Sequence, residues 1–362
     1  MVTLLKKPLN HENSMGLVRY YLAFAVFVAH FNVVFDTDIY FPTSSYNAVG
    51  GFFALSGFLV YRSFLKSTSV KSYLLKRARR ILPPYIFIVL VCAFGLVLVS
   101  DLSLKDYFFN IQWIKYLVSN LLFLNFIEPE LPGVFRNLGV HAVNGSLWTM
   151  KIEVMLYVSV PVVAWLFSKV HRKWEKADIM MLFGAIYLFS IIYRITFHEL
   201  YAAYGHEMFN ILSRQVFGQL MYFYAGVFIY FQYERFMRYR LHIVAGCVLF
   251  MLLGDYIPYY QFIISPLVVS SLVIFFSSFK MMPVFNRHNI SYDIYLFHMP
   301  IMMTVCSFAG KDTSGVFGSF GIVLVLTILL GYMVWFGIER RFMLRNSAQK
   351  NVPTGEMSIG AR

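Results

Sequence analysis

The sequence predicts an all-α polytopic membrane protein with about ten transmembrane helices and both termini in the cytoplasm. Of its 362 residues, 59% are hydrophobic and only 14% are charged, whereas about a quarter of the residues of a soluble globular domain are charged. Ten stretches are apolar and long enough to cross a bilayer, which takes about 20 residues. They lie at 17–36, 46–66, 80–100, 147–168, 178–197, 214–232, 241–255, 261–279, 289–308 and 316–339.

The distribution of positive charge supports this topology. With the N-terminus inside, 24 of the 31 Lys and Arg residues fall in cytoplasmic segments, as the positive-inside rule requires. The net charge of +13 is therefore topogenic, and nucleic acid is not an expected partner. Polar residues interrupt a further apolar segment at 106–126, where we expect an interfacial or re-entrant helix pair. An eleventh span there would invert every later loop.

One integral-membrane domain is expected over 1–345, followed by a polar, disordered cytoplasmic tail over 346–362. Lys6 and Lys7 precede the first apolar stretch, which is too long for the core of a signal peptide and predicts an uncleaved first helix. All three cysteines lie in apolar stretches, so neither a disulfide framework nor a metal site is expected.

The first stretch carries Arg19 near its start and His30 eleven residues later. Eleven residues make about three turns of α-helix, so both side chains lie on one face, roughly 16 Å apart along the axis. An ionisable side chain inside a membrane segment is costly and is a functional-site candidate by default. The pair predicts chemistry on a group that enters the membrane.

Small residues mark the second stretch, where they allow the backbone to approach another helix or a ligand closely. They are Gly50, Gly51, Ala54 and Gly57. On spacing alone, helix packing is the favoured explanation.

A dense basic cluster follows at 62–80, where topology or lipid headgroups alone would account for positive charge. Within it, Arg77 and Arg80 are three residues apart and share a helix face. Paired guanidinium groups bind phosphate oxygens in bidentate fashion, which suits a phosphate-bearing ligand such as coenzyme A. The chain has no P-loop or dinucleotide fingerprint, so an ATP-driven mechanism is not expected.

The fourth stretch contains a carboxylate, Glu153, close to the expected outer face. A lone carboxylate in a membrane usually pairs with a cation, and Lys151 or Arg136 is available. A structural ion pair and a role in an active site are equally reasonable.

The ninth stretch contains a second intramembrane histidine, His298. Tyr292, Tyr295 and His298 recur every three residues along one helix face, which fits either a hydrogen-bonded core histidine or a site residue. His141, just before the fourth stretch, is a minor candidate.

Taken in order, these segments resemble the acyltransferase type 3 family of bacterial membrane O-acyltransferases. The resemblance covers nearly the whole chain, and each motif is weak alone while the ordered set is specific. One departure is Met150, where the family more often has Leu. The motifs are Arg19-x10-His30, the SGFL run 56–59, the R-x-x-R pair Arg77 and Arg80, the SLWTMKIE block ending at Glu153, and ISYDIYLFH ending at His298.

This resemblance implies transfer of an acyl group, usually acetyl from acetyl-CoA, to a hydroxyl of a cell-envelope carbohydrate such as O-antigen or exopolysaccharide. It implies a multi-pass protein of the bacterial inner membrane, with acyl-CoA, a glycan or lipid-linked saccharide acceptor and the lipid bilayer as partners, and no metal. Coenzyme A would bind from the cytosol, and the acceptor would be reached from the periplasmic side.

We expect His30 to act as the general base on the acceptor hydroxyl, because imidazole is the side chain best matched to that task near neutral pH. Transient acylation of His30 is an alternative. Arg19 would position the donor below it, and either Glu153 or His298 would orient the base or bind the acceptor. The expected coenzyme A contacts are Arg77 and Arg80 at the phosphates, and Ser56 and Gly57 along the tunnel.

A transporter or flippase of lipid-linked sugars is the rival interpretation, because it also predicts many spans and intramembrane charge. The basic entrance beside Arg19 and the lack of an internal inverted repeat disfavour it. A non-catalytic sensor or scaffold leaves His30 unexplained.

Overall fold

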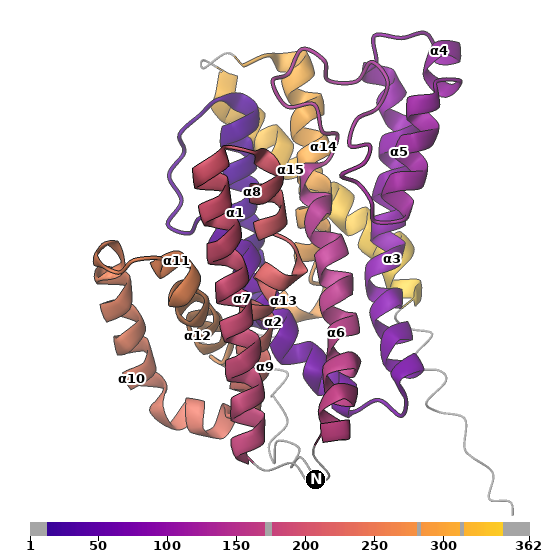
Figure 1. Cartoon of the computed structure of the whole chain (residues 1–362). Helices are drawn as coiled ribbons and strands as arrows, with labels where there is room; N and C mark the ends of the chain where they lie inside the picture. The colour runs from indigo at the N-terminus through magenta and orange to yellow at the C-terminus, as the bar shows by residue number, and fades with distance from the viewer. Residues whose placement is uncertain (1–12, 171–175, 281–283, 312–314, 343–362) are drawn as a thin grey trace, which may run out of the picture.

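The computed structural model describes residues 13–170, 176–280, 284–311 and 315–342, and within them the protein is helical, with a single isolated bridge between Ser100 and Val134 in place of strands. Each of the ten predicted stretches overlaps one of ten long helices, although α10 begins at Tyr233, before the predicted 241 (Figure 1). They are α1 (Met15–Phe35), α2 (Ser45–Leu65), α3 (Val70–Gly95), α6 (Trp148–Val170), α7 (Lys176–Tyr204), α9 (Val216–Phe231), α10 (Tyr233–Leu252), α12 (Ser265–Ser277), α14 (Ser291–Ala309) and α15 (Val316–Val334).

Shorter helices complete the described chain. They are α4 (Leu104–Phe108), α5 (Ile111–Leu121), α8 (Glu207–Ser213), α11 (Tyr260–Ile263) and α13 (Val284–Arg287). The interrupted segment 106–126 thus contains two short helices, α4 and α5, rather than one long one. The predicted tail 346–362 lies outside the described residues.

The all-helical prediction is confirmed. Six helical segments of the described chain are long and apolar enough to cross a membrane, and they include α1, α2, α3, α6, α7 and α15. The other four long helices are shorter or more polar; α12, for example, has 13 residues and an axial length of about 20 Å. The count of ten spans and the cytoplasmic termini therefore stay predictions.

Two helices distant in sequence, α1 and α14, start at the same end of the molecule and run parallel. Their starts are joined by hydrogen bonds, from Asn289 Nδ2, just before α14, to the Gly16 carbonyl at 3.2 Å and from the Ile290 amide to the Tyr20 hydroxyl at 3.0 Å. Helix α6 runs in the opposite direction to α14, since residue numbers rise on one side as they fall on the other in the contacts of Ser146 with His298, Thr149 with Tyr295, and Met150 with Tyr292. The relative directions of α1, α6 and α14 bring His30, His298 and Ser146 together.

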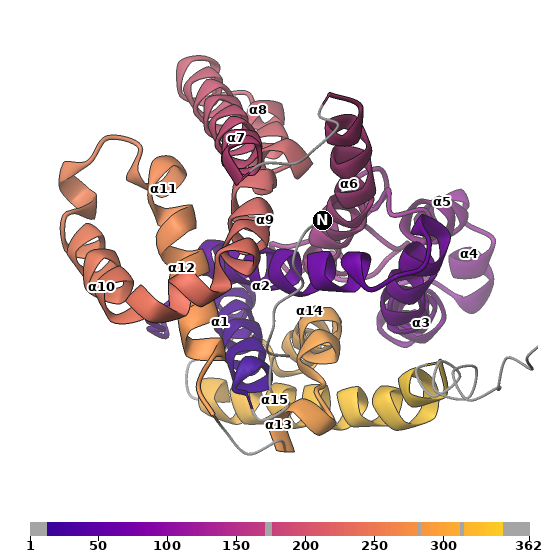
Figure 2. The ribbon, with the colours of Figure 1, turned by 90° about the horizontal axis from the view of Figure 1, so that it is seen from below.

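Helix α2 crosses the middle of the bundle, with α9 on one side and α1 and α14 on the other (Figure 2). Glycines bring α2 and α9 into close contact at two places. A Cβ at Gly57 would collide with the Phe223 carbonyl, and a Cβ at Gly226 would collide with the Ala54 carbonyl. Gly57 therefore allows α2 and α9 to pack closely, which is the explanation that the spacing of the small residues favours.

Replacing glycine by alanine should change the stability of the protein differently at Gly57, which lies in this contact, and at Gly184, which does not. Gly57→Ala should destabilise the protein by about 1–3 kcal/mol, because the added methyl overpacks the α2–α9 contact. Gly184→Ala, on α7 with open space around it, should be neutral or stabilising by up to about 1 kcal/mol, since alanine favours helix. Thermal unfolding of both variants in detergent measures the difference; equal midpoints would contradict the packing role.

Candidate active site

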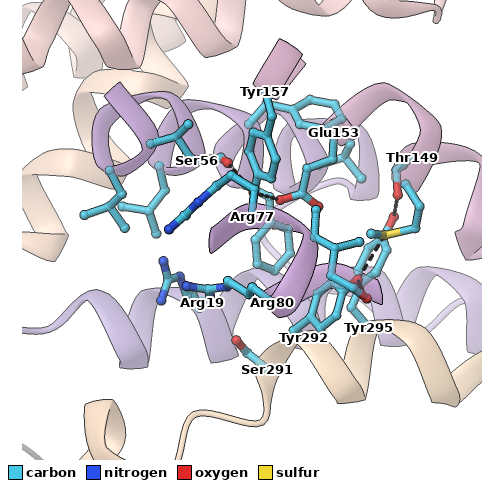
Figure 3. A pocket seen from close by; sticks show the side chains of 18 residues that line it. Arg19, Ser56, Arg77, Arg80, Thr149, Glu153, Tyr157, Ser291, Tyr292 and Tyr295 are labelled. Carbon is cyan, nitrogen blue, oxygen red and sulfur yellow. Dashed lines mark hydrogen bonds between the residues drawn. The ribbon is translucent and has the colours of Figure 1, made fainter. Parts of the chain in front are cut away.

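Five helices surround a cavity with about 810 Å³ of empty space, including its open mouth (Figure 3). The helices are α1, α2, α3, α6 and α14, and the cavity combines an arginine-rich end with an aromatic end. Its polar lining consists of Arg19, Ser56, Arg77, Arg80, Thr149, Glu153, Tyr157, Ser291, Tyr292 and Tyr295.

Three guanidinium groups reach one end of this cavity from two helices. Arg19 comes from the first turns of α1, and Arg77 and Arg80 come from one face of α3. Arg77 Nη2 lies 3.4 Å from Ser63 Oγ, while its Nε is buried without a hydrogen-bond partner. Donors that are fixed in place and unused are suited to binding an anion.

The only acidic side chain among the lining residues, Glu153, is engaged by a hydroxyl. The Tyr157 hydroxyl donates to the Glu153 carboxylate, and Ser56 Oγ donates to the Tyr157 hydroxyl at 3.2 Å (Figure 3). The Tyr73 hydroxyl fixes the same turn of α6 by donating to the Tyr157 carbonyl at 2.9 Å. With three cations and one carboxylate, the cavity carries an excess of positive charge.

Lys151, one of the two cations considered from the sequence as a partner of Glu153, is engaged elsewhere. Lys151 instead lies over the ring of Phe126, with its Nζ 4.4 Å from the ring centroid. The structure therefore places Glu153 beside the arginines of the cavity rather than in an ion pair with Lys151. Tyr157, four residues later, shares its helix face.

Helices α6 and α14 are aligned by three successive side-chain contacts. The Tyr292 hydroxyl lies 3.8 Å from Met150 Sδ, and the Tyr295 hydroxyl lies 2.8 Å from Thr149 Oγ1. The third contact joins Ser146 Oγ to His298 Nε2 at 3.5 Å. The residues of the first two contacts line the cavity, and the third contact places His298 next to them.

Three of the side chains that line the cavity are in contact with one another at its end nearest His298. Thr149 is hydrogen-bonded to Tyr295, whose ring packs edge-on against Phe52 at 5.7 Å between centroids. All three line the cavity, and the Tyr295 ring centroid is 6.2 Å from that of His298. We call Phe52, Thr149 and Tyr295 the Tyr295 layer.

Beyond the Tyr295 layer, His30 and His298 form a directly bonded pair. His30 Nδ1 lies 2.7 Å from His298 Nε2, and the rings are stacked, with centroids 5.0 Å apart and an interplanar angle of 17°. His298 is fully buried, whereas His30 is half-buried. His30 is not among the residues that line the arginine cavity, whereas Arg19 of the same helix is.

The loop that contains Ser146 is held against α14 by a hydrogen bond to a carbonyl that Pro300 leaves without its helical partner. Pro300 has no backbone N–H, so the Leu296 carbonyl lacks its intrahelical donor. Asn144 Nδ2 supplies one at 2.8 Å, and Asn144 Oδ1 accepts the Ser146 amide at 3.1 Å. The loop before α6 is thereby attached to α14 at Leu296, two residues before His298.

The structure thus separates the eight residues singled out from the sequence into three groups. Arg19, Ser56, Arg77, Arg80 and Glu153 line the cavity. His30 and His298 form the pair beyond it, and Gly57 faces α9 instead of the cavity. The sequence analysis overlooked Tyr157, which the i, i+4 spacing from Glu153 could have indicated, and Asn144, whose partner is visible only in three dimensions.

A family model described as an acyltransferase domain matches residues 12–336, which include the whole cavity and the histidine pair. Comparison with curated proteins and with solved structures gave no match.

The bond between Asn144 and α14 predicts coupling to Pro300. Asn144→Ala should cost about 1–3 kcal/mol, because it leaves the buried Leu296 carbonyl unsatisfied. In a Pro300→Ala background, residue 300 regains an N–H for that carbonyl, so the same substitution should cost clearly less. Thermal unfolding of the two single variants and the double variant tests this; an identical loss in both backgrounds would contradict the assignment.

Proposed function

Because the chain belongs to the acyltransferase type 3 family, we propose that it transfers an acetyl group from acetyl-CoA to a hydroxyl of a cell-envelope carbohydrate such as O-antigen or exopolysaccharide. Family membership supports a membrane acyltransferase in general terms. The observation that carries the more specific proposal is the cavity lined by Arg19, Arg77 and Arg80, which ends next to the His30–His298 pair.

The arginine end of the cavity suits the phosphates of coenzyme A. Guanidinium groups bind phosphate oxygens in bidentate fashion, and Arg77 retains a buried N–H without a partner. Behind them, the hydroxyls of Ser56 and Tyr157 face the space that the pantetheine amides would occupy. Glu153 keeps the empty cavity partly neutral and holds Tyr157 in place.

In the proposed reaction, the thioester passes the Tyr295 layer and reaches His30. His30 takes the proton from the acceptor hydroxyl while that oxygen attacks the thioester carbonyl. The carbon–sulfur bond breaks, and the proton passes from His30 to the leaving thiolate. The products are the acetyl ester and free coenzyme A, and His30 returns to its neutral form.

The positions of Arg19 and His30 along α1 support opposite routes for the two substrates. Arg19 lies in the first turns of α1, and half-buried His30 lies eleven residues further along the same helix. We propose that the donor enters at the Arg19 end from the cytosol of a bacterial inner membrane, and that the glycan reaches His30 from the other side.

Labelled acetyl-CoA tests the proposed reaction in membranes that contain the chain and envelope glycan. Wild-type protein should produce an ester-linked, alkali-labile label on the glycan. His30→Ala should lower the rate by about 10²–10⁴ at equal expression, since it removes the general base. Wild-type activity in that variant would remove His30 from the mechanism, and no transfer by either protein would contradict acetyl transfer.

Thermal unfolding with coenzyme A tests the donor cavity independently of the acceptor. Coenzyme A at 100 times its Kd should stabilise the wild type by about 2.7 kcal/mol. Arg77→Gln and Arg80→Gln should each weaken binding about 10–100-fold, because each removes a charge-assisted hydrogen-bond donor.

Arg240→Gln is the matched control, because Arg240 is exposed on α10 and outside the cavity. It should bind coenzyme A as the wild type does. A transporter of lipid-linked sugars would show no stabilisation by coenzyme A in any variant.

A further inference from the structure

We infer that His298 is a positioning residue, which fixes His30 in the tautomer whose Nε2 is free to take the proton of the acceptor. This inference rests on the proposed function of His30 as the base and assigns one role to each histidine. It follows from the hydrogen-bond partners of the two rings.

The first step is the Ile294 carbonyl, which can only accept a hydrogen bond. His298 Nδ1 lies 2.8 Å from it, so His298 Nδ1 carries a proton and donates. In a neutral imidazole one nitrogen donates and the other accepts. His298 Nε2 is then the acceptor.

The second step is the bond between the rings. His298 Nε2 lies 2.7 Å from His30 Nδ1, so an accepting His298 Nε2 requires a proton on His30 Nδ1. His30 Nε2 is then left with its lone pair, as a general base needs. Ser146 Oγ, 3.5 Å from His298 Nε2, has its hydroxyl available for the same acceptor.

The opposite assignment would need a doubly protonated His298, which would donate from both nitrogens and place the proton of His30 on Nε2. His298 is 0% exposed, and its neighbours include the rings of Phe27 and Tyr295. A buried cation without a counter-ion is strongly disfavoured. The neutral form of His298 therefore sets the direction of the bond.

The same hydrogen bond also holds the His30 ring in place after His30 has accepted a proton. The imidazolium still donates from Nδ1 to His298 Nε2, so the ring need not turn before it returns the proton to the leaving thiolate. A third group that orients the base plays this part in hydrolytic triads. Here a neutral imidazole does so, within a stacked pair.

Two amide substitutions at position 298 test separately the bond of His298 to the Ile294 carbonyl and its bond to His30. A glutamine amide reaches the place of His298 Nε2 and can accept from His30, whereas an asparagine amide reaches only the place of His298 Nδ1 and can donate to Ile294. His298→Gln should keep kcat within about tenfold of the wild type. His298→Asn should lower kcat about 10²-fold, because a misplaced base costs about that much; the KM for acetyl-CoA should be unchanged in both variants.

A purely structural role predicts equal losses in the two variants, or a larger loss for His298→Gln, and either result overturns the inference. Activity retained by His30→Gln together with loss in His298→Gln would overturn it as well, because His298 would then be the base. If His298→Asn does not fold in detergent, the pair His30→Gln and His298→Gln decides alone.

Chemical labelling tests the same assignment without turnover, so it separates this inference from the proposed activity. Diethyl pyrocarbonate modifies unprotonated imidazole nitrogens, and mass spectrometry of the full-length protein after digestion identifies the modified histidine. We expect modification of half-buried His30 and protection of His298. Modification of His298 with protection of His30 would overturn the inference even if acetyl transfer is observed.

Discussion

A polar group inside a bilayer must find its partner within the protein, because lipid offers none. In this chain one part of the requirement is met between α14 and the segment 144–150, which leads into α6. Their register aligns Tyr295 with Thr149 and His298 with Ser146, while Asn144 satisfies the carbonyl released by Pro300. The parallel start of α1 and α14 then sets His30 against His298. The proposed chemistry therefore depends on the same hydrogen bonds that allow these helices to pack.

The sequence predicts correctly those features that depend only on residues close together in the chain. Long apolar runs predict helices regardless of their neighbours, and all ten predicted stretches overlap helices, with some ends displaced. The spacing of Arg77 and Arg80 likewise places both on one face, and both line the cavity. Ten crossings do not follow from ten helices, because α9, α10, α12 and α14 lack the length or the apolar character of the other six.

Contacts between distant helices could not be predicted in this way. His30 and His298 are separated by 268 positions, so their bond depends on the relative position of α1 and α14 rather than on any motif. The small residues of α2 show the same limit. Their spacing indicates close approach, but whether a partner helix or a ligand approaches is decided by packing, and Gly57 faces the Phe223 carbonyl. Glu153 lies beside the arginines because α6 runs antiparallel to α14.

The Tyr295 layer has a consequence for the cell that is separate from catalysis. A protein with a charged, open cavity at one end of its helices and a half-buried imidazole further along could become a path for protons, and such a leak would discharge the membrane potential. Here the ring of Tyr295, packed against Phe52 and bonded to Thr149, stands between the cavity and the histidines. If the proposed donor does pass this layer, the packing around Tyr295 is the barrier that limits proton leakage through the chain while no donor is bound.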